Sequence, residues 1–362
     1  MQEGANPPRQ LQALGQSLWL DNLTRGLLDG GGLRRYIDEM SVTGLTSNPT
    51  IFDHAIKGSA DYDADIRAGT ARGRSGEALF FDLACADIAR AADLFAAVHA
   101  RTHGVDGWVS LEVSPLLAHD TRATIAAARE LHARIARPNL FVKIPGTPEG
   151  LPAIEEAIFA GVPVNVTLLF DADQYRAAAD AYMKGIERRL EAGQPLQVGC
   201  VASVFMSRWD KAVADVVPAE LRNKLALAVG LDVYRAYREV LDSERWQRLE
   251  GEGARPQRLL WASTSTKDPT APDTLFVTGL ASPNTINTMP DETLEAFHDH
   301  GTLDGVLPAD GGDADAQLAA FEAAGVDVKA LAAKLQADGA QAFVDSWHDL
   351  LKRIVEQTGA VT

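Results

Sequence analysis

Short apolar runs recur eight times along the chain, and longer stretches with helical periodicity separate them. The predicted strands cover residues 17–23, 42–48, 107–113, 139–145, 162–170, 196–205, 258–264 and 273–280. Strands that alternate with helices predict a parallel sheet of the α/β class that helices cover. A count of eight favours a closed (β/α)8 barrel, the TIM-barrel fold, over an open sheet.

Helical signals also follow the last predicted strand. Residues 314–357 are rich in Ala, with interruptions near Gly325 and Gly339. We expect these helices to pack on the outside of the barrel. Because no Pro- or Ser-rich linker divides the chain, we predict one barrel domain over residues 1–362, with extra helices at its N- and C-terminal ends.

Charge and composition restrict the partners. The chain carries 50 acidic and 34 basic side chains, and its formal net charge of −16 disfavours binding to nucleic acid or to an anionic membrane. No apolar run approaches the roughly 18 residues of a membrane span, and no signal peptide is evident at the N-terminus. The two cysteines, Cys85 and Cys200, form no CxxC motif and no disulfide framework. We therefore expect a cytoplasmic protein. Because no helix face has the pattern of a subunit seam, we expect either a monomer or a homodimer.

Polar side chains stand near the carboxyl ends of the predicted strands, where α/β barrels carry their chemistry. The polar candidates are Asp21, Thr46, Asn48, Glu112, Lys143, Asn165, Thr167, Ser203, Arg208, Ser265 and Lys267. The aromatic Phe205 joins them as a twelfth candidate, because it shares a strand face with Ser203. Any single Asn or Thr of this kind is more often a satisfied core residue, and Glu112 with Lys143 alone would fit a structural ion pair. An ion pair, however, does not require amides and hydroxyls around it, so the whole set indicates a functional site.

Lys143 is the candidate that most specifies the chemistry. A lysine held among apolar strands loses hydration, which favours the uncharged amine. An uncharged amine attacks carbonyl carbons and forms a Schiff base. Glu112, one strand away, would supply the acid for the accompanying proton transfers, and Thr167 would hold a water. Asp21 would serve a second proton transfer.

The remaining candidates predict a polar, anionic ligand. Asn48, Asn165 and Ser203 would bind substrate hydroxyls, and Arg208 and Lys267 would bind an anionic group such as phosphate. The eight histidines are scattered along the chain, so we expect no metal site.

Eight segments resemble the transaldolase family, the class I aldolase-type barrels of the pentose phosphate pathway, and in particular its bacterial branch. They are LWLDNL around Asp21, TGLTSNPTIF at 43–52, SLEVSP at 110–115, FVKIPGT at 141–147, NVTLLF at 165–170, ASVFMSRWD at 202–210, WASTSTKDP at 261–269 and PNTINTMP at 283–290. These segments follow the family's order from about residue 17 to residue 290. The resemblance implies a TIM barrel and no cofactor beyond the lysine itself.

The resemblance also implies catalytic roles. Lys143 would form the Schiff base, and Glu112 would act as acid and base through a water that Thr167 holds. Asp21 would be the acid and base for cleavage between C3 and C4 of the donor. The reaction would move a dihydroxyacetone unit from sedoheptulose 7-phosphate or fructose 6-phosphate to glyceraldehyde 3-phosphate or erythrose 4-phosphate.

Binding roles follow from the same resemblance. The substrate-binding candidates are Thr46, Asn48, Asn165, Ser203 and Phe205. Arg208 matches a phosphate-binding arginine, whereas many members carry a second arginine where this chain has Lys267. Lysine can still bind phosphate, although as a point charge without a bidentate fork. We therefore expect Ser265 and Lys267 to complete the phosphate site.

Three functions are compatible with these residues. The first is a transaldolase, and the second is a class I aldolase similar to fructose 6-phosphate aldolases. In the wider family, a tyrosine two residues after the serine of strand six accompanies aldolase activity, so Phe205 favours the transferase, although core packing would also explain it. The third is a non-catalytic sugar-phosphate binder, which would use Arg208 and Lys267 but would not need Lys143.

Overall fold

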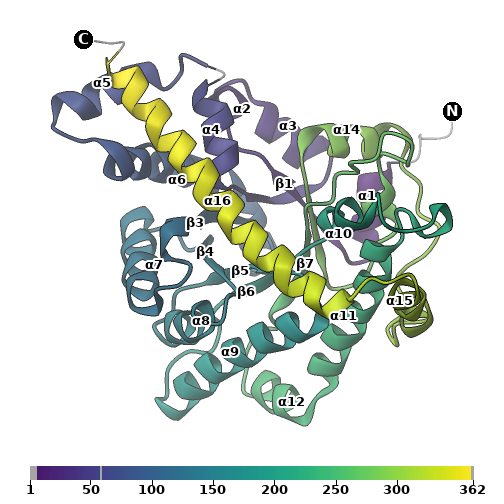
Figure 1. The fold of residues 1–362 in the computed structure, drawn as a ribbon. Helices are drawn as coiled ribbons and strands as arrows, with labels where there is room; N and C mark the ends of the chain where they lie inside the picture. Colours follow the sequence, from purple (N-terminus) through teal and green to yellow (C-terminus); the bar gives the residue numbers. More distant parts are fainter. Residues whose placement is uncertain (1–5, 58, 360–362) are drawn as a thin grey trace, which may run out of the picture.

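The computed structural model describes residues 6–57 and 59–359, and within them eight parallel strands close into a barrel in chain order (Figure 1). The strands are β1 (Ser17–Asp21), β2 (Val42–Thr46), β3 (Trp108–Glu112), β4 (Leu140–Pro145), β5 (Val164–Leu169), β6 (Cys200–Phe205), β7 (Arg258–Ala262) and β8 (Ile286–Met289). Pairing of β1 with both β2 and β8 closes the barrel. The predicted (β/α)8 fold is confirmed.

Helices surround the strands. They are α1 (Pro7–Ala13), α2 (Arg25–Asp29), α3 (Gly32–Glu39), α4 (Pro49–Lys57), α5 (Asp63–Ala71), α6 (Gly76–Arg101), α7 (Thr121–Ile135), α8 (Gly150–Phe159), α9 (Ala172–Glu191), α10 (Ser207–Val213), α11 (Leu225–Asp242), α12 (Glu244–Gly251), α13 (Leu275–Thr278), α14 (Asp291–His300), α15 (Ala314–Ala323) and α16 (Val328–Gly359), with 3-10 turns η1 (Pro115–Leu117) and η2 (Ala219–Leu221). Among the described residues, no helix combines the length and the apolar character that a membrane span requires.

The central strands are buried along their whole length. Every residue of β4, β5 and β6 is buried, because one face fills the barrel and the other packs against helices. This double burial explains why these strands read as largely apolar runs, in which a few polar residues stand out. It also means that Lys143, on β4, lies in an interior where a charged side chain is uncommon.

The prediction of the eighth strand is wrong. Residues 273–280 contain the short helix α13, and the strand that closes the barrel is β8. The apolar side chains of Phe276 and Val277 are buried, but on a helix. β8 reads INTM, and its Asn287 and Thr288 are buried polar residues, so no apolar run marks this strand in the sequence.

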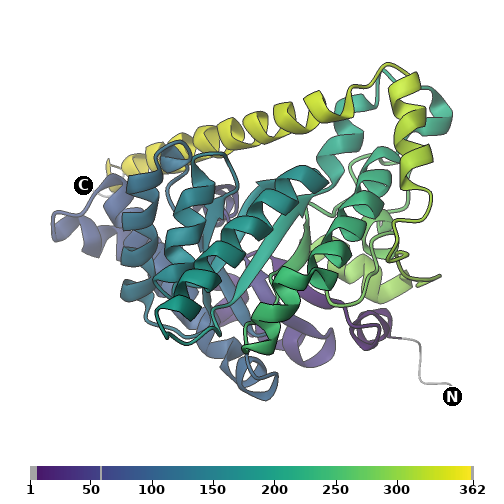
Figure 2. The same ribbon diagram turned by 90° about the horizontal axis from the view of Figure 1, so that it is seen from below.

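The last helix, α16, lies across the carboxyl-terminal end of the barrel. In Figure 1 it runs diagonally in front of the central strands, and in Figure 2 it runs along one edge of the molecule. It contacts α4, α5, α6, η1 and β5. The Nε2 of Gln336 donates hydrogen bonds to the carbonyl oxygens of Gly146, at 3.1 Å, and Leu168, at 2.9 Å. The C-terminal helices were expected to pack on the outside of the barrel. The last of them, α16, covers the end of the barrel that holds the candidate residues.

Two glycines near the C-terminus differ in their effect. The predicted interruption near Gly325 is confirmed, because α15 ends at Ala323 and Gly325 adopts a left-handed φ of 89°. The predicted interruption at Gly339 is wrong, because α16 continues through it. The expectation of a single domain stays a prediction.

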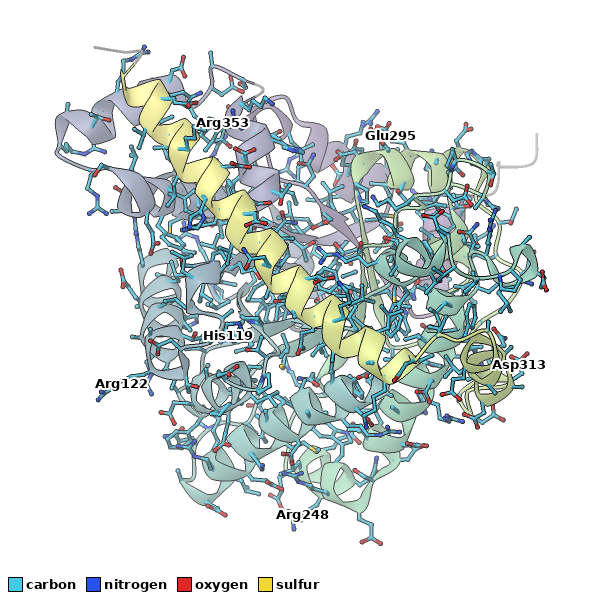
Figure 3. All side chains as sticks on the ribbon, in the orientation of Figure 1. His119, Arg122, Arg248, Glu295, Asp313 and Arg353 are labelled. Carbon is cyan, nitrogen blue, oxygen red and sulfur yellow. The ribbon has the colours of Figure 1, made fainter. Side chains whose placement is uncertain are left out.

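An ion pair and aromatic packing stabilise the position of the C-terminal part of α16. Arg353, which Figure 3 labels on this helix, donates from its Nε to the Oδ1 of Asp53 on α4 at 2.6 Å. Trp347 packs edge-on against Phe80 of α6, with ring centroids 4.9 Å apart. These contacts hold the helix in place over the barrel.

Candidate active site

A pocket of about 410 Å³ opens at the carboxyl ends of the strands. Ten of the predicted site residues line it, namely Asp21, Thr46, Asn48, Lys143, Thr167, Ser203, Phe205, Arg208, Ser265 and Lys267. Phe343 of α16 forms part of the same wall. The other two predicted residues, Glu112 and Asn165, are buried between these side chains, and hydrogen bonds join them to Thr167 and Ser203. The fold thus brings all twelve candidates together.

A larger pocket, of about 620 Å³, lies at the opposite end of the barrel. Ser17, Trp108 and Arg258, which begin three of the strands, line it, and none of the predicted site residues does. Arg258 is already committed there, because it pairs with Asp106 at 3.2 Å and donates to the hydroxyl of Ser17 at 2.6 Å. The smaller pocket is therefore the candidate active site.

Lys143 and Glu112 form the centre of this site. They occupy paired positions on β4 and β3, and each residue is only 5% exposed. The Nζ of Lys143 lies 3.6 Å from the Oε2 of Glu112 and donates to the carbonyl oxygen of Ser47 at 2.8 Å. The hydroxyl of Thr167 donates to the Oε1 of Glu112 at 3.3 Å. Among the described residues the Oε2 of Glu112 has no hydrogen-bond partner, which leaves it available to a ligand or a water.

Asp21 forms a second acidic position in the pocket. It pairs with Thr46 across β1 and β2, and the Thr46 hydroxyl lies 2.7 Å from the Oδ1 of Asp21. The same hydroxyl lies 2.7 Å from that of Thr288 on β8. This arrangement fixes the carboxylate of Asp21 at the mouth of the barrel.

Burial changes the acidity of both carboxyl groups. Loss of hydration raises the pKa of Glu112, although Lys143 and the hydrogen bond from Thr167 oppose the shift. Loss of hydration likewise raises the pKa of Asp21, and Lys143 and Thr46 oppose it. Carboxyl groups with raised pKa values exchange protons more readily near neutral pH, as acid–base catalysis requires.

A chain of hydrogen bonds orients the amide of Asn165. The hydroxyl of Ser203 donates to its Oδ1 at 2.7 Å, and its Nδ2 donates to the hydroxyl of Ser110 at 3.2 Å. Because one side of the amide accepts and the other donates, these two partners fix which way Asn165 faces. Asn48 lies elsewhere on the pocket wall, where its Oδ1 accepts the backbone N–H of Ile51 at 3.0 Å.

Besides Lys143, two basic side chains, Arg208 and Lys267, line the pocket. The guanidinium carbon of Arg208 lies 5.1 Å from the ring centroid of Phe205 and 5.9 Å from that of Phe343. Burial lowers the pKa of Arg208 from its usual value. The Nζ of Lys267 donates to the hydroxyl of Ser265 at 2.5 Å, and this pair is the more exposed of the two cationic positions. Arginine and lysine side chains that face one cavity suit a phosphate group.

Several residues that contact the site were not among the predicted ones, and three of them are instructive. Ser110 precedes Glu112 by two positions on β3, so the shared strand face could have revealed it. Thr288 lies on β8, the strand that the sequence pattern misplaces. Phe343 carries no comparable signal, because helical periodicity does not tell which surface a distant helix covers.

No cluster of three or more His, Cys, Asp or Glu side chains suited to a metal ion occurs in residues 6–57 and 59–359. Cys85 and Cys200 are both free and buried. Burial raises the pKa of the Cys85 thiol to about 11 and that of Cys200 to about 12, which disfavours the reactive thiolate.

Comparison with known proteins agrees with this geometry. Residues 18–354 match the family described as Transaldolase/Fructose-6-phosphate aldolase. A transaldolase of Thermobifida fusca is 45% identical over 99% of this chain and 100% of its own length. Transaldolases of an Arthrobacter species (44%; 95% of each chain) and of Neisseria gonorrhoeae (42%; 95% of this chain and 98% of its own) are also similar. The chain belongs to the transaldolase/fructose-6-phosphate aldolase family.

Proposed function

We propose that this transaldolase moves a dihydroxyacetone unit between sugar phosphates through a Schiff base on Lys143. The donor is sedoheptulose 7-phosphate or fructose 6-phosphate, and the acceptor is glyceraldehyde 3-phosphate or erythrose 4-phosphate. One observation carries the proposal. The Lys143 amine, buried and 3.6 Å from a buried carboxylate, faces a pocket that two further cations and several hydroxyls line.

The first half of the reaction cleaves the donor. The Nζ of Lys143 attacks the C2 carbonyl, and loss of water leaves an iminium. Glu112 passes protons to and from the departing oxygen through a water that Thr167 holds, a role that its 3.3 Å contact with Thr167 supports. Asp21 then accepts the proton of the C4 hydroxyl. The electron pair of the C3–C4 bond moves toward the iminium, which releases an aldose phosphate and leaves an enamine.

The second half repeats these steps in reverse. The enamine carbon attacks the aldehyde of the acceptor, and Asp21 returns its proton to the new alkoxide. Water then hydrolyses the iminium, with Glu112 as the acid and base, and frees Lys143. Because the enamine must survive until the acceptor arrives, the site has to keep a competing proton away from it. The hydrocarbon ring of Phe205, which lines the pocket, provides no such proton.

The remaining groups bind substrate in this proposal. Asn48, Asn165 and Ser203 contact the hydroxyls of the dihydroxyacetone unit, and Thr46 orients Asp21 beside them. Arg208, with Ser265 and Lys267, holds the phosphate at the open side of the pocket.

The broader setting follows from the same chemistry. Lys143 itself acts as the electron sink, so we propose that the reaction uses no cofactor and no metal. We place the protein in the cytoplasm, in the non-oxidative pentose phosphate pathway, as a monomer or homodimer. Its partners are small sugar phosphates, and the formal net charge of −16 disfavours nucleic acid and membrane surfaces.

A transfer assay tests this proposal against the aldolase reading. Fructose 6-phosphate with erythrose 4-phosphate should yield glyceraldehyde 3-phosphate and sedoheptulose 7-phosphate, and omission of the acceptor should stop product formation after one turnover. Steady release of dihydroxyacetone without an acceptor would instead identify an aldolase. In that assay Phe205→Tyr, which adds a hydroxyl at the pocket wall, should increase release without an acceptor.

The same assay addresses a non-catalytic binder. Lys143→Arg keeps a cation on β4 but cannot form the Schiff base, so turnover should vanish while phosphate binding persists. A parent protein that binds fructose 6-phosphate without turnover, and that is unchanged by this substitution, would support the binder.

A further inference from the structure

Gly339 stands inside a helix of 32 residues, although glycine is a poor helix former. A Cβ atom at this position would lie 2.8 Å from the Nη1 of Arg208 and 2.9 Å from the Cδ2 of Leu168. Both distances are below any ordinary van der Waals contact. The absence of a side chain at Gly339 therefore leaves the space that the guanidinium of Arg208 occupies.

Phe343 forms the next part of the same surface. It follows Gly339 by four residues, so the two positions lie on one face of α16. Phe343 is 6% exposed and lines the pocket, and its ring centroid lies 5.9 Å from the guanidinium carbon of Arg208. Phe205 presents a second ring to the same guanidinium at 5.1 Å, and the planes of the two rings meet at 66°. Arg208 is thus enclosed by two aromatic rings and by the glycine.

Direct polar contacts do not hold Arg208 in place, although the carboxylate of Glu112 attracts it electrostatically. Within the described part of the chain it forms no ion pair and no hydrogen bond, whereas Arg25, Arg245 and Arg353 each pair with carboxylates. Cations lie favourably against aromatic rings at these distances. Two aromatic rings position this guanidinium, and no carboxylate of the described residues accepts a hydrogen bond from it. Its N–H donors therefore stay free for an anionic ligand.

We propose that α16 is a positioning element for the phosphate site, and that Gly339 and Phe343 set the place and orientation of the Arg208 guanidinium. The proposal rests on the proposed function, because it assigns the phosphate of the sugar to Arg208. It explains why a glycine stands inside α16 at the position where the helix crosses the pocket. It also makes the C-terminal helix a part of substrate recognition rather than a cover alone.

Substitutions on α16 distinguish an effect on the position of the Arg208 guanidinium from an effect on the stability of the fold. Gly339→Ala should retain or raise the stability of the fold, because alanine favours the helix and the two crowded atoms are the free ends of flexible side chains. It should nevertheless displace the guanidinium and weaken phosphate binding. Phe343→Leu removes one ring face and keeps an apolar side chain. From the typical strength of cation–π contacts we expect KM for phosphorylated substrates to rise by about two- to thirtyfold in Phe343→Leu. In Gly339→Ala it should rise as well, because the added methyl group displaces the guanidinium.

Matched controls lie outside the pocket. Gly251→Ala changes a glycine of α12 at which a Cβ atom would meet no other atom within 4 Å, and Phe321→Leu changes a buried phenylalanine of α15. Both should leave every kinetic constant unchanged. For all proteins we would measure KM and kcat with glyceraldehyde 3-phosphate and with unphosphorylated glyceraldehyde as acceptors. Calorimetric titration measures the affinity of each protein for inorganic phosphate, which does not depend on turnover.

The expected result is a selective loss. Gly339→Ala and Phe343→Leu should weaken inorganic phosphate binding and raise KM for the phosphorylated acceptor, without changing KM for glyceraldehyde. Equal effects on both acceptors, or none on either, would overturn the positioning role. If the parent protein showed no transfer and no adduct on Lys143, the proposed function would fail, and the phosphate titration would still decide whether α16 positions Arg208.

Discussion

Replacement of Glu112 by glutamine probes the proton transfers most sharply. Glutamine keeps the shape of the side chain and an oxygen that can accept from Thr167, but it cannot exchange a proton. The Oε2 of Glu112 lies 3.6 Å from the Lys143 amine and has no other partner among the described residues. The substitution therefore removes the carboxylate oxygen that lies beside the reacting nitrogen. A positioned acid or base typically contributes about 10²- to 10⁴-fold to a rate.

Glu112→Gln should therefore lower kcat by about 10²- to 10⁴-fold, which corresponds to about 2.7–5.5 kcal/mol in the activation free energy. The acceptor-dependent release of glyceraldehyde 3-phosphate, coupled to its reduction and followed by NADH absorbance, measures this loss. Glu77→Gln provides the control. Glu77 lies on α6, accepts a hydrogen bond from the hydroxyl of Ser114 at 3.3 Å, and does not line the pocket. A Glu112→Gln variant with the parent's kcat would refute the assignment of Glu112 as the acid and base.

The pH dependence gives an independent check of the same carboxyl group. Burial raises the pKa of Glu112, and the hydrogen bond from Thr167 is one of the contacts that oppose this rise. Thr167→Val removes that bond, so the pKa of Glu112 should rise further. Because the carboxylate must be ionised to act as a base, the acidic limb of the rate profile should move to higher pH. Thr167→Ser keeps the hydroxyl and should leave the limb in place, and identical profiles for all three proteins would contradict the assignment.

Three further predictions concern other parts of the site and its cover. Asp21→Asn should block cleavage of the C3–C4 bond while Schiff-base formation continues, so borohydride should trap intact donor on the protein rather than a three-carbon unit. Lys267→Met should raise KM for phosphorylated substrates roughly tenfold or more, because charged hydrogen bonds contribute about 1.5–3 kcal/mol, and KM for glyceraldehyde should not change. Trp347→Ala should lower the free energy of unfolding by about 3–5 kcal/mol in urea titrations, because it leaves a cavity where the buried indole packs on Phe80.

The barrel could be predicted from the sequence largely because its strands are buried on both faces. Double burial makes β4 and β5 largely apolar, so a polar residue inside such a run, such as Lys143 or Asn165, stands out. The register of neighbouring strands then places Glu112 beside Lys143. For this reason the candidate site could be predicted from the sequence.

The errors have physical causes of their own. β8 is a strand of four residues with two buried polar side chains, so it shows neither the length nor the apolar run that identifies a strand. The apolar residues of α13 carry that pattern instead. Gly339 predicts a helix break because glycine disfavours helices, but here the neighbouring Arg208 needs the space. Such tertiary contacts leave no trace in local periodicity, and Phe343 was missed for the same reason.

Borohydride trapping tests the central claim, that a Schiff base forms on Lys143, most directly. The parent protein is reduced in the presence of fructose 6-phosphate, its intact mass is measured, and the modified peptide is mapped. We expect one reduced dihydroxyacetone unit on Lys143, and none in Lys143→Arg under the same conditions. A parent protein that gains no mass, or that carries the adduct on a different lysine, would contradict the claim.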